Sequence, residues 1–132
     1  RQDTGLPVEV TADNLSVDQG DGSAVFTGNV LIGQGEMRLS AARVLVVYRA
    51  EAEGIARLEA TGGVTLVSGK DAAESERADY DIDTGTIVMS GNVLLTQGRN
   101  ALSSDTMSVK LSDGTAQMSG RVKTILQTGS NN

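Results

Sequence analysis

The chain has 132 residues, a net charge of −6 and only three aromatic side chains, and it contains neither cysteine nor histidine. These absences exclude disulfides and thiolate metal sites, and they remove the commonest general base and transition-metal ligand. An acidic chain with so few aromatic rings is also a poor partner for nucleic acid.

Two sequence markers alternate along the chain. One is a glycine that opens a short apolar segment, found at Gly28, Gly62, Gly91 and Gly120. The other is a small residue followed three positions later by alternating apolar residues, found at Ala12, Ala41, Ser75 and Ser104. The second marker lies 13 residues after each of the first three glycines, and the next glycine lies 16 residues after the marker, or 21 residues in one case. The markers therefore define four units of about 29 residues, with a five-residue insertion that we place in residues 49–54.

The alternation predicts strands. In residues 24–32 every even position carries an apolar or small residue, whereas Thr27 and Asn29 lie at odd positions; residues 58–66, 87–95 and 116–124 repeat this pattern. A period of two over such a length is typical of a strand with one buried face. Glycine weakens a strand, so glycines at four matching positions indicate a sharp bend or a close backbone approach.

The segments that follow the small residues change parity at their middle. Leu39 and Ala41 share one parity, but Val44 and Val46 share the opposite one, and the same slip follows Ala12 and Ser104. A β-bulge or corner must absorb the extra residue, because otherwise half of each strand would turn its apolar side chains to solvent. Each long strand is therefore predicted to fold over at its midpoint.

Turn-forming residues complete the predicted fold. Hairpin turns are expected at residues 18–22, 83–85 and 112–114 at one end, and at 33–35, 68–70 and 96–98 at the other. The predicted fold is all-β, a bent antiparallel β-jellyroll of two facing sheets with open ends, built from the four repeats. We expect residues 1–132 to form one domain with flexible tails at about 1–5 and 128–132. The sequence has no run of apolar residues long enough for a transmembrane helix.

Several short segments occur in a fixed order over residues 6–127, namely VEVTAD (8–13), FTGNV (26–30), AARVLV (41–46), ADY (78–80), MSGNV (89–93) and RVKTIL (121–126). This set resembles the LptA/OstA-type family of periplasmic lipopolysaccharide transport domains. The resemblance implies a non-enzymatic protein of the Gram-negative periplasm that carries lipid A acyl chains in its interior. It also implies head-to-tail joining, with itself and with homologous domains of the inner-membrane and outer-membrane subunits, into a bridge between the membranes.

The resemblance also implies a set of groove residues, which are the interior positions that match the family pattern. They are Val8, Val10, Phe26, Val30 and Ile32 near the first edge, Val64, Leu66, Tyr80, Ile82, Met89, Val93 and Leu95 in the middle, and Met118 and Val122 near the far edge. A mostly aliphatic wall suffices for alkyl chains, since each buried methylene contributes roughly 0.8 kcal/mol. No catalytic residue, cofactor or metal is predicted, because no histidine is present to activate the hydroxyls of Ser103 and Ser104.

Alternatives remain at this point. An apolar stripe on strands is also what a filled core produces, so a structural β-filament with a dry interior is the second hypothesis. A third is the related domain of the membrane-anchored or outer-membrane translocon subunit of the same pathway. The chain starts at Arg1 without a methionine or signal sequence, as a processed exported protein would.

Two charged sets have a functional and a plain interpretation. The arginines at positions 38, 43, 49 and 57 could meet phosphates, but their acidic neighbours favour a solvated face. The acidic residues at positions 71, 74, 76, 79, 81 and 83 suggest calcium, yet they lack the glycine-spaced order of an EF-hand loop.

Overall fold

The structure is a computed structural model that describes residues 6–18, 20, 22–49 and 54–127. Its strands are β1 (Glu9–Thr11), β2 (Asn14–Asp18), β3 (Ser23–Gln34), β4 (Met37–Tyr48), β5 (Ile55–Ser68), β6 (Asp71–Asp81), β7 (Thr86–Gln97), β8 (Asn100–Lys110), β9 (Thr115–Ser119) and β10 (Lys123–Ile125). The all-β prediction is confirmed. The described residues include no helix with the length and hydropathy needed to cross a membrane. The predicted tails, 1–5 and 128–132, lie outside the described residues.

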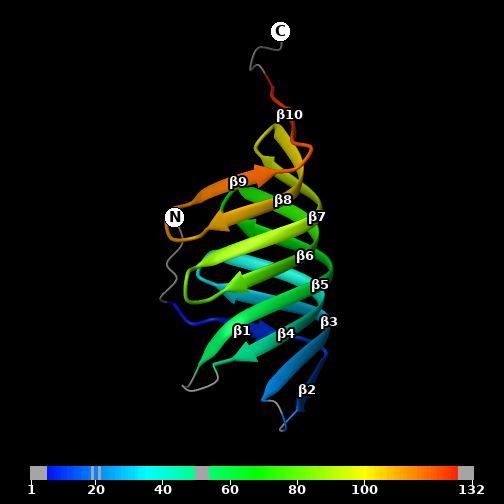
Figure 1. Cartoon of the computed structure of the whole chain (residues 1–132), viewed down its shortest axis with the longest axis vertical. Helices are drawn as coiled ribbons and strands as arrows, with labels where there is room; N and C mark the ends of the chain where they lie inside the picture. Colours follow the sequence, from blue (N-terminus) through cyan, green and yellow to red (C-terminus); the bar gives the residue numbers. More distant parts are fainter. Residues whose placement is uncertain (1–5, 19, 21, 50–53, 128–132) are drawn as a thin grey trace.

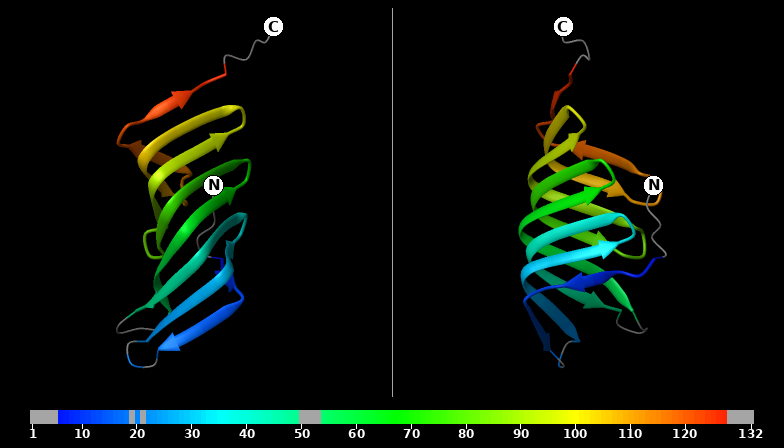
Figure 2. Two further views of the ribbon diagram at one scale, coloured as in Figure 1. Left: turned by 90° about the vertical axis from the view of Figure 1, so that its right-hand side faces the viewer. Right: turned by 180° about the vertical axis from the view of Figure 1, so that it is seen from behind.

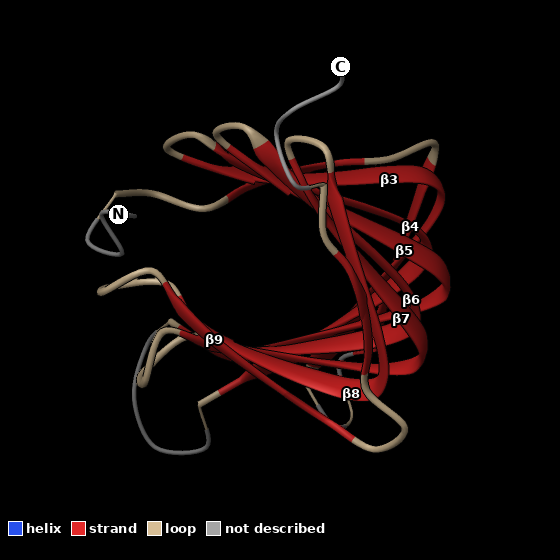
Figure 3. Ribbon diagram, turned by 90° about the horizontal axis from the view of Figure 1, so that it is seen from above, coloured by secondary structure: helices blue, strands red, loops and turns tan. Residues whose placement is uncertain are grey.

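All ten strands belong to one antiparallel sheet with the order β1-β3-β4-β5-β6-β7-β8-β10, while β2 also pairs with β3 and β9 with β8. The long strands stack along the molecule (Figures 1 and 2) and bend midway, so that the sheet folds over on itself. Viewed from above, the ribbon has a C-shaped outline, with the bends on one side and the hairpin turns on the other (Figure 3).

The bends divide the sheet into two walls that face each other. Wall A consists of β2, β9 and the arms 23–27, 43–48, 55–61, 77–81, 86–90 and 106–110. Wall B consists of β1, β10 and the arms 30–34, 37–41, 64–68, 71–75, 93–97 and 100–104. Alternation along each arm therefore directs one set of side chains into the space between the walls.

Each bend is a bulge in which two residues at positive φ oppose a single residue. At one of them Gly91 (φ 86°) and Asn92 (φ 50°) lie opposite Glu76, and the strand register shifts at this point. The Asn92 side-chain amide donates a hydrogen bond to the Glu76 carboxylate at 2.6 Å. The other bends pair Gly28-Asn29 with Asp13, Gly62-Gly63 with Ala42 and Gly120-Arg121 with Asp105. Both the predicted bend at the glycines and the predicted bulge after the small residues are thus confirmed.

Glycine is required at the first position of each bend for two reasons. A Cβ atom at Gly91 would lie 2.8 Å from the Cβ of Glu76, and at Gly62 it would lie 2.7 Å from the Cβ of Ala42. Both glycines also have φ near +87°, a conformation that costs an L-residue about 1–2 kcal/mol. The chain therefore bends where a side chain is missing, and the opposite strand fills the space.

Two expectations about the turns need correction. Residues 33–35 do not form a turn, because Gly33 and Gln34 belong to β3 and the turn is Gly35-Glu36; the equivalent turns are likewise the pairs 69–70 and 98–99. The insertion is not confined to residues 49–54 either. It also lengthens the arms of β4 and β5, where the register shifts again between Val47 and Tyr48, and residues 50–53 of its loop lie outside the described part.

The core occupies the middle of the stack, between the walls. Ile32, Met37, Val44, Ile87 and Met89 are at most 1% exposed. The ends of the stack are less covered, and Leu15 and Val17 on β2 and Val122 and Leu126 beside β10 are all more than half exposed. Within the described residues, the inward side chains at each end of the stack have no further repeat unit to pack against.

Candidate functional site: the apolar interior

The structure places thirteen of the fourteen predicted groove residues in or against the interior cluster. Eight are buried, namely Val30, Ile32, Val64, Leu66, Tyr80, Met89, Val93 and Leu95; five are partly buried, namely Val8, Val10, Phe26, Ile82 and Met118. The fourteenth, Val122, is 52% exposed. It holds the position of Val93 in the last unit, but no described strand lies beyond it.

An unfilled space of about 180 Å³ lies between the walls in the C-terminal half of the stack. Its lining is largely aliphatic, with a few polar side chains from the strand ends: Leu66, Ser68, Asp71, Ala72, Ala73, Leu95, Gln97, Met107, Val109, Leu111, Gly114 and Ala116. Only Leu66 and Leu95 of the predicted groove residues belong to this lining. Met107, Val109 and Leu111 were missed as groove residues, although the alternation that follows Ser104 indicated that they point inward.

In the N-terminal half, a polar contact crosses the interior. Tyr80, on wall A, donates a hydrogen bond from its hydroxyl to the side-chain oxygen of Gln34, on wall B, at 2.5 Å. The side-chain nitrogen of Gln34 donates to the carbonyl oxygen of Leu6 at 2.8 Å. Tyr80 and Gln34 are 1% and 2% exposed. Three segments that are distant in sequence are therefore tied together inside an apolar space.

Burial affects the chemistry of this contact. Removal of the phenol from water raises the pKa of Tyr80, and the hydrogen bond to Gln34 offsets part of the rise. The hydroxyl therefore remains protonated and able to donate. Sequence reasoning missed Gln34, because a glutamine between two glycines is typical of a turn and nothing local indicates a buried partner.

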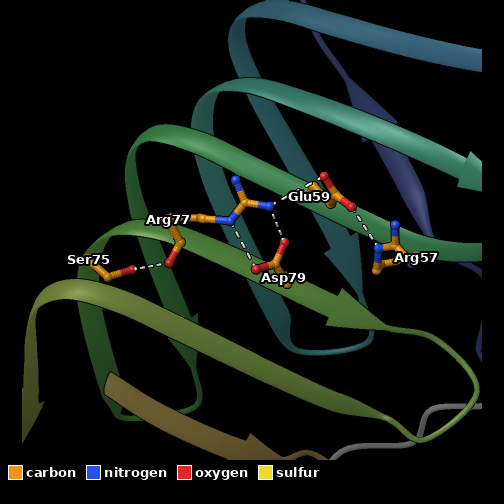
Figure 4. A network of polar contacts seen from close by, with 5 residues as sticks. All are labelled: Arg57, Glu59, Ser75, Arg77 and Asp79. Carbon is orange, nitrogen blue, oxygen red and sulfur yellow. Dashed lines mark hydrogen bonds and ion pairs between the residues drawn. The ribbon is translucent and has the colours of Figure 1, made fainter. Parts of the chain in front are cut away.

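The charged side chains form pairs on the outer face of wall A (Figure 4). Arg77 binds Asp79 at 2.9 Å and Glu59 at 3.4 Å, and Glu59 also accepts a hydrogen bond from Arg57 at 2.7 Å. These hydrogen bonds and charges raise the pKa of Arg77, with Asp79 as the largest cause. The arrangement fits the interpretation of a solvated face.

The remaining charged candidates do not converge on a ligand site. Arg49 pairs with Asp83, which lowers the pKa of that carboxyl group, and Arg38 donates to the backbone carbonyls of Gly35 and Met37. Within the described ranges, no group of three or more acidic side chains is arranged to hold a metal ion.

The two ends of the stack are unpaired edges. Among the described strands, β1 and β2 pair only with β3, and β9 and β10 pair only with β8. Each end thus presents free backbone groups beside exposed apolar side chains, which is the usual template for adding another strand.

Comparison with known proteins identifies the family. A family model described as "LptA/(LptD N-terminal domain) LPS transport protein" matches residues 9–122. An uncharacterised protein of Rhizobium meliloti (strain 1021) is 30% identical over 90 residues, which are 63% of this chain and 48% of that protein. The match therefore spans about half the length of this curated relative.

Among solved structures, the fold matches LptH, the LptA-homologous periplasmic component of the lipopolysaccharide transport device of Pseudomonas aeruginosa. The TM-score is 0.84 at 16% identity, over 96% of this chain and 99% of LptH. The predicted β-jellyroll is thereby confirmed. Because the family model covers most of the sequence, the chain belongs to the LptA/LptD N-terminal domain family of lipopolysaccharide transport proteins.

Proposed function

We propose that this chain is a non-enzymatic periplasmic protein that shields acyl chains of lipopolysaccharide between its two walls. The observation that carries the proposal is the unfilled space of about 180 Å³, which is lined largely by aliphatic side chains of both walls. Apolar cavities of about 150 Å³ are large enough to accept a small apolar ligand. Each methylene that moves from water into it contributes about 0.8 kcal/mol, so the site needs no charged group.

We further propose that residues 1–132 act as one OstA-like unit of a bridge from the inner to the outer membrane. The support is the pair of unpaired edges, β1–β2 at one end and β9–β10 at the other. Joining such ends would continue both walls into the next domain and would cover Leu15, Val17 and Val122. The partners would be copies of the chain and the homologous domains of the two membrane subunits.

A structural β-filament is the second candidate, and one observation favours it. Five of the predicted groove residues, Val30, Ile32, Tyr80, Met89 and Val93, are at most 1% exposed because other side chains already cover them. An interior filled in this way requires no ligand for its stability. The two candidates differ only in whether the C-terminal half takes up an alkyl chain.

Displacement of a fluorescent alkyl probe from delipidated protein would separate them. A carrier should bind the probe with saturable stoichiometry and release it to lipopolysaccharide, and less readily to the deacylated lipid, because the acyl chains supply the apolar area. A filament with a dry interior should leave the probe fluorescence unchanged at every protein concentration. That result would contradict the proposed carrier function.

A further inference from the structure

The repeat allows each interior position to be compared with its counterpart one unit further along. Gln34 and Ser68 are equivalent, because each lies six residues after its bend glycine, Gly28 or Gly62. Tyr80 and Val109 are equivalent in the same way, since each follows its marker serine, Ser75 or Ser104, by five residues.

The two pairs also occupy matching places in the strand order. Gln34 on β3 meets Tyr80 on β6, three strands further along the stack. Ser68 on β5 and Val109 on β8 are separated by the same three strands, and both line the unfilled space. The site that Gln34 and Tyr80 occupy in one unit is therefore the site that is hollow in the next.

The volume of the side chains accounts for this difference. A tyrosine and a glutamine span the interior and hydrogen-bond each other, whereas a serine and a valine are too short to meet. Opening the first site would separate two polar groups in an apolar space, which is costly. Entry into the second site separates no such pair.

We propose that the Tyr80–Gln34 pair is a partition across the N-terminal half of the interior, so that an alkyl chain bound by the isolated unit rests in the C-terminal half between β5 and β9, and passage along a bridge requires the pair to open. Ser68 and Val109 are the residues that leave this half open. The inference rests on the proposed function and adds to it the location of the chain and the residues that determine this location.

The direct test is to transfer the partition by one unit. The double variant Ser68→Gln/Val109→Tyr places the same two side chains across the hollow site. Its affinity for a fluorescent alkyl probe should fall by about tenfold or more, which is the loss expected when two methylenes lose their burial. The matched control is Val67→Gln/Ser108→Tyr, which adds the same side chains at the neighbouring exposed positions and should bind like the parent chain.

A mapping experiment on the unaltered protein keeps the proposal testable if the double variant does not fold. A photoreactive alkyl phosphate is crosslinked to the chain, and the modified peptides are identified by mass spectrometry. Adducts should lie on the lining of the hollow site, such as Leu95, Met107 and Leu111. Adducts on Ile32 or Leu58, on the closed side, would overturn the partition.

The outcomes separate this inference from the proposed function. If the parent chain binds no probe, both fail. If the parent chain binds and the folded variant Ser68→Gln/Val109→Tyr binds equally well, the partition alone is wrong. The reciprocal variant Gln34→Ser/Tyr80→Val should retain the original binding and gain adducts in the N-terminal half; retention without any new adduct would also contradict the partition.

Discussion

At the scale of single residues, the interior combines two kinds of position. Most inward side chains are aliphatic and covered by one another, whereas Tyr80 and Gln34 are polar and satisfy each other across the walls. A buried pair of this kind adds specificity to the packing, because any shift between the walls breaks its geometry. The neighbouring unit lacks the pair, and its walls leave space.

The first prediction compares two adjacent residues of β7. Leu95 lines the hollow site and is 8% exposed, while Leu94 points outward and is 38% exposed. Leu95→Glu should lower the affinity for an alkyl probe by at least about tenfold, since a carboxylate in an apolar site loses its hydration. Leu94→Glu should change neither binding nor the unfolding midpoint appreciably. Equal loss of probe binding in both variants would show that the inward parity assigned to Leu95 does not matter for the ligand.

Asn29 and Asn92 are unsuitable positions for an outward-facing control substitution. Asn29 and Asn92 are neighbours of inward residues, yet both have positive φ and donate to carboxylates, those of Asp13 and Glu76. A glutamate at either position would place two like charges together at a strained corner. Outward residues within the straight arms are therefore the proper controls.

The second prediction concerns Tyr80→Phe. Loss of the hydroxyl removes a buried hydrogen bond to Gln34 and should lower the free energy of unfolding by about 1–3 kcal/mol. Because burial raises the pKa of Tyr80 above its ordinary 10.0, the folded chain keeps the phenol neutral where the unfolded chain ionises it. The contribution is thus complete below about pH 10 and is lost as the pH rises through the folded-state pKa. Denaturant titrations of both chains across this range should show their difference shrinking as the pH rises; a constant difference would argue against a buried phenol.

At the scale of elements, the bends determine the fold. Each combines positive backbone φ on one strand with a single opposing residue on the other, and three of them add a side-chain contact to Asp13, Glu76 or Asp105. These contacts lie on the exposed outer corner, so each contributes modestly. The backbone conformation and the missing Cβ supply most of the constraint.

The third prediction separates conformational strain from steric clash. Gly91 and Gly98 both have positive φ, but a Cβ at Gly91 would lie 2.6 Å from a carboxylate oxygen of Glu76 and 2.8 Å from its Cβ, whereas at Gly98 nothing lies within 4 Å. Gly98→Ala should cost about 1–2 kcal/mol of unfolding free energy from strain alone. Gly91→Ala should cost about 1–3 kcal/mol more, because the two strands must move apart. Chemical denaturation measures both, and equal losses would mean that the close approach at the bend is easily relieved.

At the scale of the whole molecule, the two ends differ in sequence but complement each other in chemistry. One end exposes Leu15 and Val17 on β2, and the other exposes Val122 and Leu126 beside β10. Contact between unlike ends is heterologous and continues into a rod unless the rotation closes a ring. Each added backbone hydrogen bond contributes only about 1 kcal/mol net, so we expect the rods to be reversible and dependent on concentration.

The fourth prediction concerns variants in which one end of the stack is made charged. Leu15→Asp/Val17→Asp at one end, or Val122→Asp/Leu126→Asp at the other, should each abolish rods in light scattering across a dilution series. An equimolar mixture of the two variants should form dimers and nothing longer, because each chain retains one intact end. Val88→Asp, an exposed position away from both ends, is the control and should still polymerise. Rods that persist in either charged-end variant would place the interface elsewhere.

The sequence by itself determined the strands, their inward faces and the bends. These features follow from local patterns, because alternation decides which side chains share a face and a glycine at positive φ decides where a strand bends. Alternation also places nearly all the predicted groove residues on the inward face, and they lie in or against the interior cluster; that they bind lipid stays a prediction.

Only the tertiary structure decided which side chains meet across the interior. Gln34 and Tyr80 are 46 positions apart, and no local pattern connects them. The hollow site likewise depends on the summed volumes of side chains from both walls, and Val122 is exposed because the described stack ends there. Periodicity along a strand specifies the direction of a side chain; what that side chain contacts depends on strands that pack against it from elsewhere in the chain.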